Sequence, residues 1–218
     1  MGCFILKGKI ITLSIGKPKV FQWKRKPEQS GIAKTIVEEV QLNKQCFEGD
    51  GVANEKFHGG PDRAICAYPF EHYEYWEKVF QKPFAPPSFG ENICVKDMIE
   101  KDVYIGDIFQ TGNVIIQITQ GRIPCSTLSK FNETDALLSK TFETGYTGYF
   151  FKVLEEGTVY SESSLELIER KQESISVLDA NLIMFERNDP QKMRDLLTLQ
   201  DLAEEWKIKL EKYIRAAK

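Results

Sequence analysis

Residues 103–119 read VYIGDIFQTGNVIIQIT, and this stretch carries the clearest fold signal in the chain. A β-rich run at 103–109 and a second one after it flank the turn residues Thr-Gly-Asn at 111–113. In the second run, Ile116 and Ile118 alternate with polar residues. Alternation with a period of two around a glycine-containing turn is typical of a β-hairpin. We therefore predict a hairpin here.

Further short β-rich segments occupy the first two thirds of the chain. They lie at 10–15, 20–23, 34–42, 64–68, 148–154 and 165–168. Short strands separated by frequent glycines are typical of a barrel or a sandwich. A helix is predicted at 69–80, where Phe70, Tyr73, Trp76 and Phe80 have helical spacing and are expected in the core.

The hydrophobic period changes from alternating to helical near Ser174. We predict one helix around 175–185, a second that Asp189 and Pro190 begin as N-cap and first residue, and a third from about residue 200. The predicted fold is mainly β with α: a β-barrel body at 1–168 and a small three-helix domain at 171–218. Helices this short need the β body or a partner to pack against.

Charge is distributed unevenly. The 218 residues carry a net charge of −3, but residues 1–34 contain eight Lys or Arg and one acid, Glu28. This basic segment indicates either a local anion site or a solvated basic edge strand. The overall charge does not favour binding to a nucleic-acid polymer, and residues 171–218, with nine basic and nine acidic residues, do not resemble a DNA reader.

Several function classes are excluded by the composition. Two histidines cannot form a three-histidine metal centre, and five cysteines without a CxxC pair do not suggest a secreted disulfide scaffold. No P-loop, no dinucleotide fingerprint and no apolar run of membrane-spanning length is visible. We expect a cytoplasmic protein that neither spans nor binds a membrane.

Three polar, glycine-containing segments are candidates for chemistry, at 48–63, 88–92 and 120–126. In the third, Cys125 follows Pro124 and lies three residues after Arg122, a cation of the kind that lowers the pKa of a nearby thiol. From the residues alone, Cys125 is either a reactive thiol or an inert buried one. His58, in the first segment, is a candidate anion ligand or proton donor.

A cysteine protease that pairs His58 with Cys125 stays a weak alternative, since no local signature of such enzymes is present. We interpret His72 as a surface residue. The other four cysteines lie in apolar or strand contexts and are interpreted as structural: Cys3, Cys46, Cys66 and Cys94.

These segments, in this order, resemble the MOSC family (molybdenum cofactor sulfurase C-terminal domains), and in particular its stand-alone bacterial members with a C-terminal three-helix "3-alpha" extension. The resemblance covers nearly the whole chain. It rests on Ser-Gly-Ile-Ala-Lys at 30–34, Gly-Asp-Gly at 49–51, His-Gly-Gly-Pro-Asp-Arg-Ala at 58–64, Phe-Gly-Glu-Asn at 89–92, Ile-Gly-Asp at 105–107 and Gly-Arg-Ile-Pro-Cys at 121–125.

The resemblance implies a β-barrel that binds the molybdenum cofactor, a pyranopterin phosphate. It implies that Cys125 ligates molybdenum or carries sulfur, with His58 as a second catalytic candidate. Cations such as Arg63, Arg122 and Lys34 suit the phosphate. The full set of implied cofactor-binding residues is Lys34, Lys56, Gly59, Gly60, Arg63, Asn92 and Arg122. Pyridoxal phosphate is often associated with the family, but it belongs to a separate domain of the eukaryotic sulfurases, and we do not expect it in this chain.

Two functions remain open within the resemblance. Family members are linked to sulfur transfer or to the reduction of N-hydroxylated compounds, including base analogues, and a reductase would need an external electron donor. The alternative is a non-enzymatic carrier of the cofactor or its sulfur, which needs only a partner protein. Four positions depart from the family pattern and put the substrate in question: Val52, Asn54, Phe57 and Tyr146.

Overall fold

The computed structural model describes residues 6–23, 26–54 and 59–216. Its strands are β1 (Lys7–Ile15), β2 (Lys19–Trp23), β3 (Lys26–Ser30), β4 (Thr35–Val37), β5 (Glu39–Leu42), β6 (Ile65–Pro69), β7 (Ile93–Lys96), β8 (Ile108–Thr111), β9 (Val114–Gly121), β10 (Tyr149–Glu155), β11 (Gly157–Tyr160) and β12 (Ser164–Glu169). Its helices are the short 3-10 helix η1 (Pro61–Arg63), α2 (Glu71–Phe80), α3 (Thr127–Phe131), α4 (Leu137–Thr144), α5 (Val177–Glu186), α6 (Pro190–Leu197) and α7 (Glu204–Ala216).

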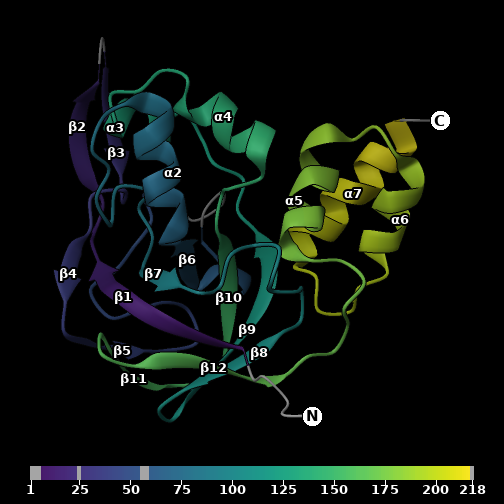
Figure 1. Cartoon of the computed structure of the whole chain (residues 1–218), viewed down its shortest axis with the longest axis horizontal. Coiled ribbons are helices and arrows are strands. Elements are labelled where there is room, and N and C mark those ends of the chain that lie inside the picture. Colours follow the sequence, from purple (N-terminus) through teal and green to yellow (C-terminus); the bar gives the residue numbers. More distant parts are fainter. Residues whose placement is uncertain (1–5, 24–25, 55–58, 217–218) are drawn as a thin grey trace.

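Seven strands close a barrel in the order β12-β8-β9-β10-β6-β7-β1, because β1 also pairs with β12 (Figure 1). Strand β4 continues the sheet beside β1, and two-stranded ribbons form from β2 with β3 and from β5 with β11. Within the closed ring, only the β6–β7 pair is parallel. The predicted fold class, a mainly β barrel with helices, is confirmed.

The predicted hairpin is formed by β8 and β9, whose register pairs Thr111 with Val114. Gly112 takes a φ of 59° in the two-residue loop, a conformation that glycine adopts without strain. Gln117 and Thr119 are buried like their apolar neighbours, because other elements cover the outer face of β9. Their side chains donate hydrogen bonds to the carbonyls of Gly106 (3.0 Å) and Asp62 (2.6 Å). The strand predicted over 103–109 begins only at 108, since turns occupy 104–107.

Helix α2 begins at Glu71, two residues after the predicted start. Tyr73 and Trp76 are buried as expected, whereas Phe70 is 37% exposed at the helix N-terminus. The prediction of a surface position for His72 is wrong. Its ring is buried, with Nε2 2.5 Å from Glu100 Oε2, because residues 98–100 and 146–148 cover this face of the helix.

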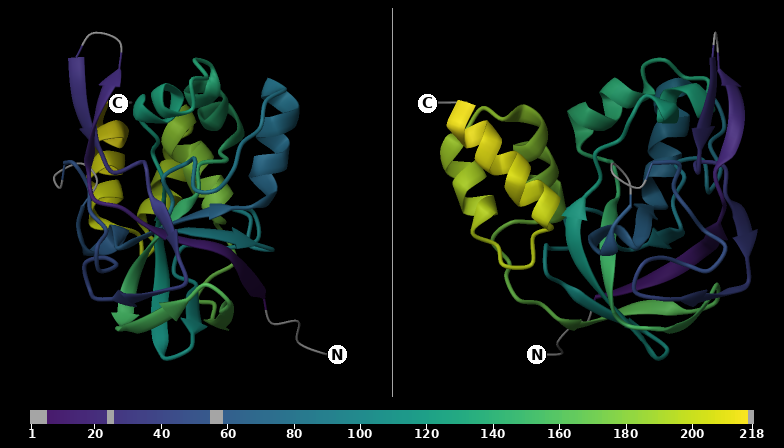
Figure 2. Two further views of the ribbon diagram at one scale, coloured as in Figure 1. Left: turned by 90° about the vertical axis from the view of Figure 1, so that its left-hand side faces the viewer. Right: turned by 180° about the vertical axis from the view of Figure 1, so that it is seen from behind.

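Three helices follow the barrel, as predicted, and the second begins at Pro190 with Asp189 as its N-cap. The third begins at Glu204 rather than near 200. Trp206 and Leu210 belong to the same buried cluster as barrel residues, so the helices pack on the β body (Figure 2). The division into 1–168 and 171–218 stays a prediction. None of the helices in the described part of the chain is long and apolar enough to cross a membrane.

Candidate functional site

A cleft of about 820 Å³ opens between the barrel and the segments that cover it. Its wall contains residues from 29–34, 45–54, 59–66, 90–92 and 122–128. Seven predicted site residues line it: Lys34, Gly59, Gly60, Arg63, Asn92, Arg122 and Cys125. The other two, Lys56 and His58, lie outside the described residues. The structure therefore brings together every predicted site residue that it describes.

Cys125 reaches the cleft because β9 ends at Gly121 and the chain then leaves the barrel. The Arg122 amide donates to the Gly148 carbonyl (3.0 Å), which fixes the first residue after the strand, and Pro124 is buried. The Leu128 amide donates to the Cys125 carbonyl (3.0 Å) as α3 begins. Cys125 itself is exposed and lines the cleft.

Arg122 supplies a permanent positive charge beside Cys125. Its Nη1 donates to the Phe89 carbonyl (2.6 Å), and this is the one hydrogen bond that its guanidinium makes to a described residue. Burial lowers the pKa of Arg122, but Cys66, Cys125 and Glu91 nearby outweigh this effect and raise it above its usual value. A guanidinium has five N–H donors, so Arg122 retains donors for an anion.

A buried network forms another part of the wall. Lys34 makes an ion pair with Asp50, and both side chains are almost fully buried. Asp50 also accepts hydrogen bonds from the Gly16 amide (2.8 Å) and from Asn92 Nδ2 (2.8 Å). The Cys66 amide donates to Asn92 Oδ1 (3.0 Å), so Asn92 ties the network to β6. Lys34 and Asn92 are thus held rigidly at the cleft.

Arg63 connects the cleft to the C-terminal helices. Its Nε donates to the Gly59 carbonyl (2.9 Å), and its Nη1 forms an ion pair with Glu205 on α7. Gly60, just before η1, has a φ of 108°, which a residue with a Cβ adopts only with strain. A glycine at 60 and the Arg63 contacts together shape this edge of the cleft.

A family model of the MOSC domain matches residues 54–166, more than half of the chain. The chain belongs to the MOSC domain family. An uncharacterized protein from Bacillus subtilis, YflK, is 38% identical over 200 residues, which cover 91% of this chain and 90% of YflK.

One solved structure, that of YiiM from Geobacillus stearothermophilus, superposes with a TM-score of 0.80. It is 32% identical and covers 95% of this chain and 99% of that one. A protein named "Reductase" from Gibberella moniliformis is 31% identical over 137 residues, 60% of this chain but 24% of that longer protein.

Two of the four positions that depart from the family pattern lie at the cleft. Val52 and Asn54 line it and are exposed, whereas Phe57 lies outside the described residues. Tyr146 is not part of the cleft wall. Its ring stacks on His72 of α2 with centroids 4.0 Å apart, so this departure does not change the described lining of the cleft.

Sequence reasoning missed other members of the MOSC cleft. Cys46 and Cys66 line it, and burial raises the pKa of both thiols; Cys94 lies elsewhere, buried in β7. Asp50 belongs to the motif at 49–51 and Glu91 to the motif at 89–92, but neither is among the predicted site residues. Glu91 is fully buried and accepts hydrogen bonds from the Tyr73 hydroxyl and the Phe89 amide, and burial raises its pKa.

Proposed function

We propose that this MOSC protein binds the molybdenum cofactor in the cleft and uses Cys125 to ligate molybdenum or to carry sulfur. The observation that carries the proposal is the exposed Cys125 beside the half-buried, permanently charged Arg122 in a cleft of about 820 Å³. Pockets for cofactor-sized ligands typically measure roughly 300–1,000 Å³. The proposal goes beyond the family relationship, which links the chain to this cofactor in general terms.

The donor set of the cleft fits a pyranopterin phosphate. A thiolate is the soft ligand that molybdenum accepts, and a guanidinium forms charge-assisted hydrogen bonds to phosphate oxygens. Gly31 lets two segments of the cleft wall pack closely, because a Cβ there would come within 2.5 Å of the Gly51 carbonyl oxygen. No group of three His, Cys, Asp or Glu in the described ranges could cage a metal by itself. A metal that arrives within an organic cofactor needs fewer protein ligands.

We assign separate roles to the residues of the cleft. Cys125 presents the sulfur, and Arg122 binds the anionic group. The Lys34–Asp50–Asn92 network keeps one wall in place, while Gly59, Gly60 and Arg63 shape the opposite edge. Lys56 and His58 are proposed to complete the site. The bound cofactor would supply two-electron redox chemistry at the metal.

Reduction of an N-hydroxylated compound is our first candidate reaction, with an external protein as electron donor. The similarity to a fungal protein named as a reductase favours it. The alternative is a carrier that holds the cofactor or a sulfane sulfur for a partner enzyme. An exposed Cys125 favours that function equally, because a partner can reach the thiol.

The test begins with the protein purified from a host that makes the cofactor. We expect molybdenum by elemental analysis and pterin by fluorescence after oxidation, both lost on Cys125→Ser, which replaces a soft sulfur with a hard oxygen. Cys94→Ala is the matched control, since Cys94 is buried in β7 away from the cleft and should keep both signals. A Cys125→Ser protein with parental molybdenum content would contradict the proposed ligand.

A second measurement separates the reductase from the carrier. Loaded protein supplied with a reduced viologen dye should convert an N-hydroxylated base analogue if it is a reductase. A carrier would show no turnover but would release thiocyanate on treatment with cyanide, in proportion to sulfur loaded on Cys125.

A further inference from the structure

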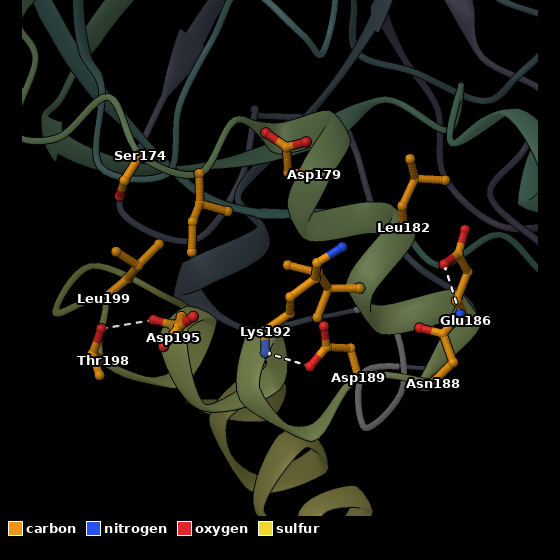
Figure 3. A pocket seen from close by; sticks show the side chains of 12 residues that line it. Ser174, Asp179, Leu182, Glu186, Asn188, Asp189, Lys192, Asp195, Thr198 and Leu199 are labelled. Carbon is orange, nitrogen blue, oxygen red and sulfur yellow. Dashed lines mark hydrogen bonds between the residues drawn. The ribbon is translucent and has the colours of Figure 1, made fainter.

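A second cavity, of about 680 Å³, lies between α5 and α6 and shares no lining residue with the cleft around Cys125 (Figure 3). Its apolar part consists of Ile175, Leu182, Ile183 and Leu199. All but Ile175 are half-buried, so apolar surface remains accessible inside a concave groove. We call this cavity the α5–α6 groove.

The rim of the α5–α6 groove is acidic. Asp179, Glu186, Asp189 and Asp195 line it, together with a single base, Lys192, which Figure 3 shows among them. None of the four carboxylates forms an ion pair with another residue of the described chain, although ten other acidic residues do. The groove therefore offers negative charge that the fold itself does not neutralise.

The distance between two carboxylates of the rim limits which ligands can contact both of them. Asp179 and Glu186 are seven residues apart on one helix, which corresponds to about 10 Å along its axis. Leu182 and Ile183 lie between them. An extended peptide advances about 3.3 Å per residue, and its side chains alternate between two faces. Basic residues four positions apart therefore share one face and span about 13 Å, which the long side chains of Lys and Arg can adjust to the spacing of the two carboxylates. One small cation would leave most of this rim unneutralised.

We propose that the α5–α6 groove binds an extended basic segment of a partner protein, in which two Lys or Arg residues four positions apart flank a leucine-like side chain midway between them. The cationic ends lie over the carboxylates and the apolar side chain contacts the Leu182 surface. Such a contact combines burial of apolar area with charge complementarity that accelerates association. This site is independent of the cofactor cleft and of its proposed chemistry.

The test uses the full chain and a fluorescein-labelled peptide, Ser-Lys-Ser-Leu-Ser-Arg-Ser, in anisotropy titrations at low and at physiological ionic strength. Asp179 and Asp189 cap helices, so the charge is removed instead at Glu186 and Asp195. We expect Glu186→Gln with Asp195→Asn to weaken binding roughly fivefold at low salt, and less at higher salt. Glu162→Gln with Glu211→Gln, two exposed acids outside the groove, is the matched control and should change nothing.

Three results would overturn the proposal. The first is equal peptide binding by the parent and by the Glu186 and Asp195 double variant. The second is equal binding of a peptide in which serine replaces the leucine, because the apolar surface would then have no role. The third is sedimentation showing that the parent alone self-associates and that the double variant is monomeric, which would make a second copy the occupant.

Discussion

At the scale of single residues, the cleft depends on charged groups that the fold holds out of water. Arg122 remains cationic because the groups around it favour its charge, whereas Glu91, which lies between the lining residues Gly90 and Asn92, is driven toward its neutral form. Burial disfavours the charged form of both groups, and only at Arg122 do the neighbours outweigh it.

The raised pKa of Glu91 makes a prediction about stability against pH. Burial raises this pKa, and hydrogen bonds from Tyr73 and the Phe89 amide offset the effect only in part. The folded state therefore holds the proton to a higher pH than the unfolded chain, and the Glu91 contribution to the free energy of unfolding falls as pH rises above about 4.3.

Glu91→Gln removes this titration. We expect the free energy of unfolding of the variant to rise relative to that of the parent between about pH 4 and about pH 7, as measured by urea denaturation at both values. A difference between the two proteins that is the same at both pH values would show that folding does not raise the pKa of Glu91 in the parent.

At the scale of elements, α5 lies directly against the end of β9. Asn181 on α5 donates to the Gly145 carbonyl (2.9 Å) and to Thr147 Oγ1 (3.0 Å), and its other side-chain atoms lie over Gly121. Because Gly121 is the last residue of β9, the same contact seats the helix and fixes where the chain leaves toward Cys125.

Gly121→Ala tests this contact. The added Cβ would overlap the Asn181 side chain, so we expect a loss of about 1–3 kcal/mol in the free energy of unfolding. Gly112→Ala is the control, since a Cβ there meets nothing and only the positive φ costs about 1 kcal/mol. Denaturant titrations that rank Gly112→Ala as the more damaging change would contradict the close packing of α5.

At the scale of the whole molecule, direct contacts join the C-terminal helices to the edge of the cleft. The Arg63–Glu205 pair joins the edge of the cleft to α7, and the Ala203 amide donates to the Thr119 carbonyl (3.0 Å) on β9. The helices are therefore part of the support of the cleft, in addition to the groove that they form themselves.

Glu205→Gln should loosen this connection. The change removes the charged group through which the largely buried Arg63 is joined to α7, and we expect faster amide hydrogen exchange at 59–64 and at the start of α7. Glu211→Gln is the matched control because its pair with Arg215 is exposed, and its exchange rates should equal those of the parent. Equal protection in all three proteins would show that the pair does not couple the two regions.

The sequence by itself determined the local elements and the reactive candidates. The alternation around 111–113 specified a hairpin, Asp189 and Pro190 specified a helix start, and Cys125 could be singled out because a strand, a proline and an arginine surround it. These features are local: each depends on residues close together in the chain, so pattern and turn chemistry suffice to predict them.

Only the tertiary structure decided what each side chain faces. The strand order β9-β10-β6-β7-β1-β4 brings Lys34, Asn92 and Cys125 to one cleft, while the ring of Tyr146 stacks on the buried His72 of α2. Helix α5 packs on β9, and Gln117 is buried with its amide donating to the Gly106 carbonyl. Such outcomes depend on contacts between residues far apart in sequence, which no local period encodes.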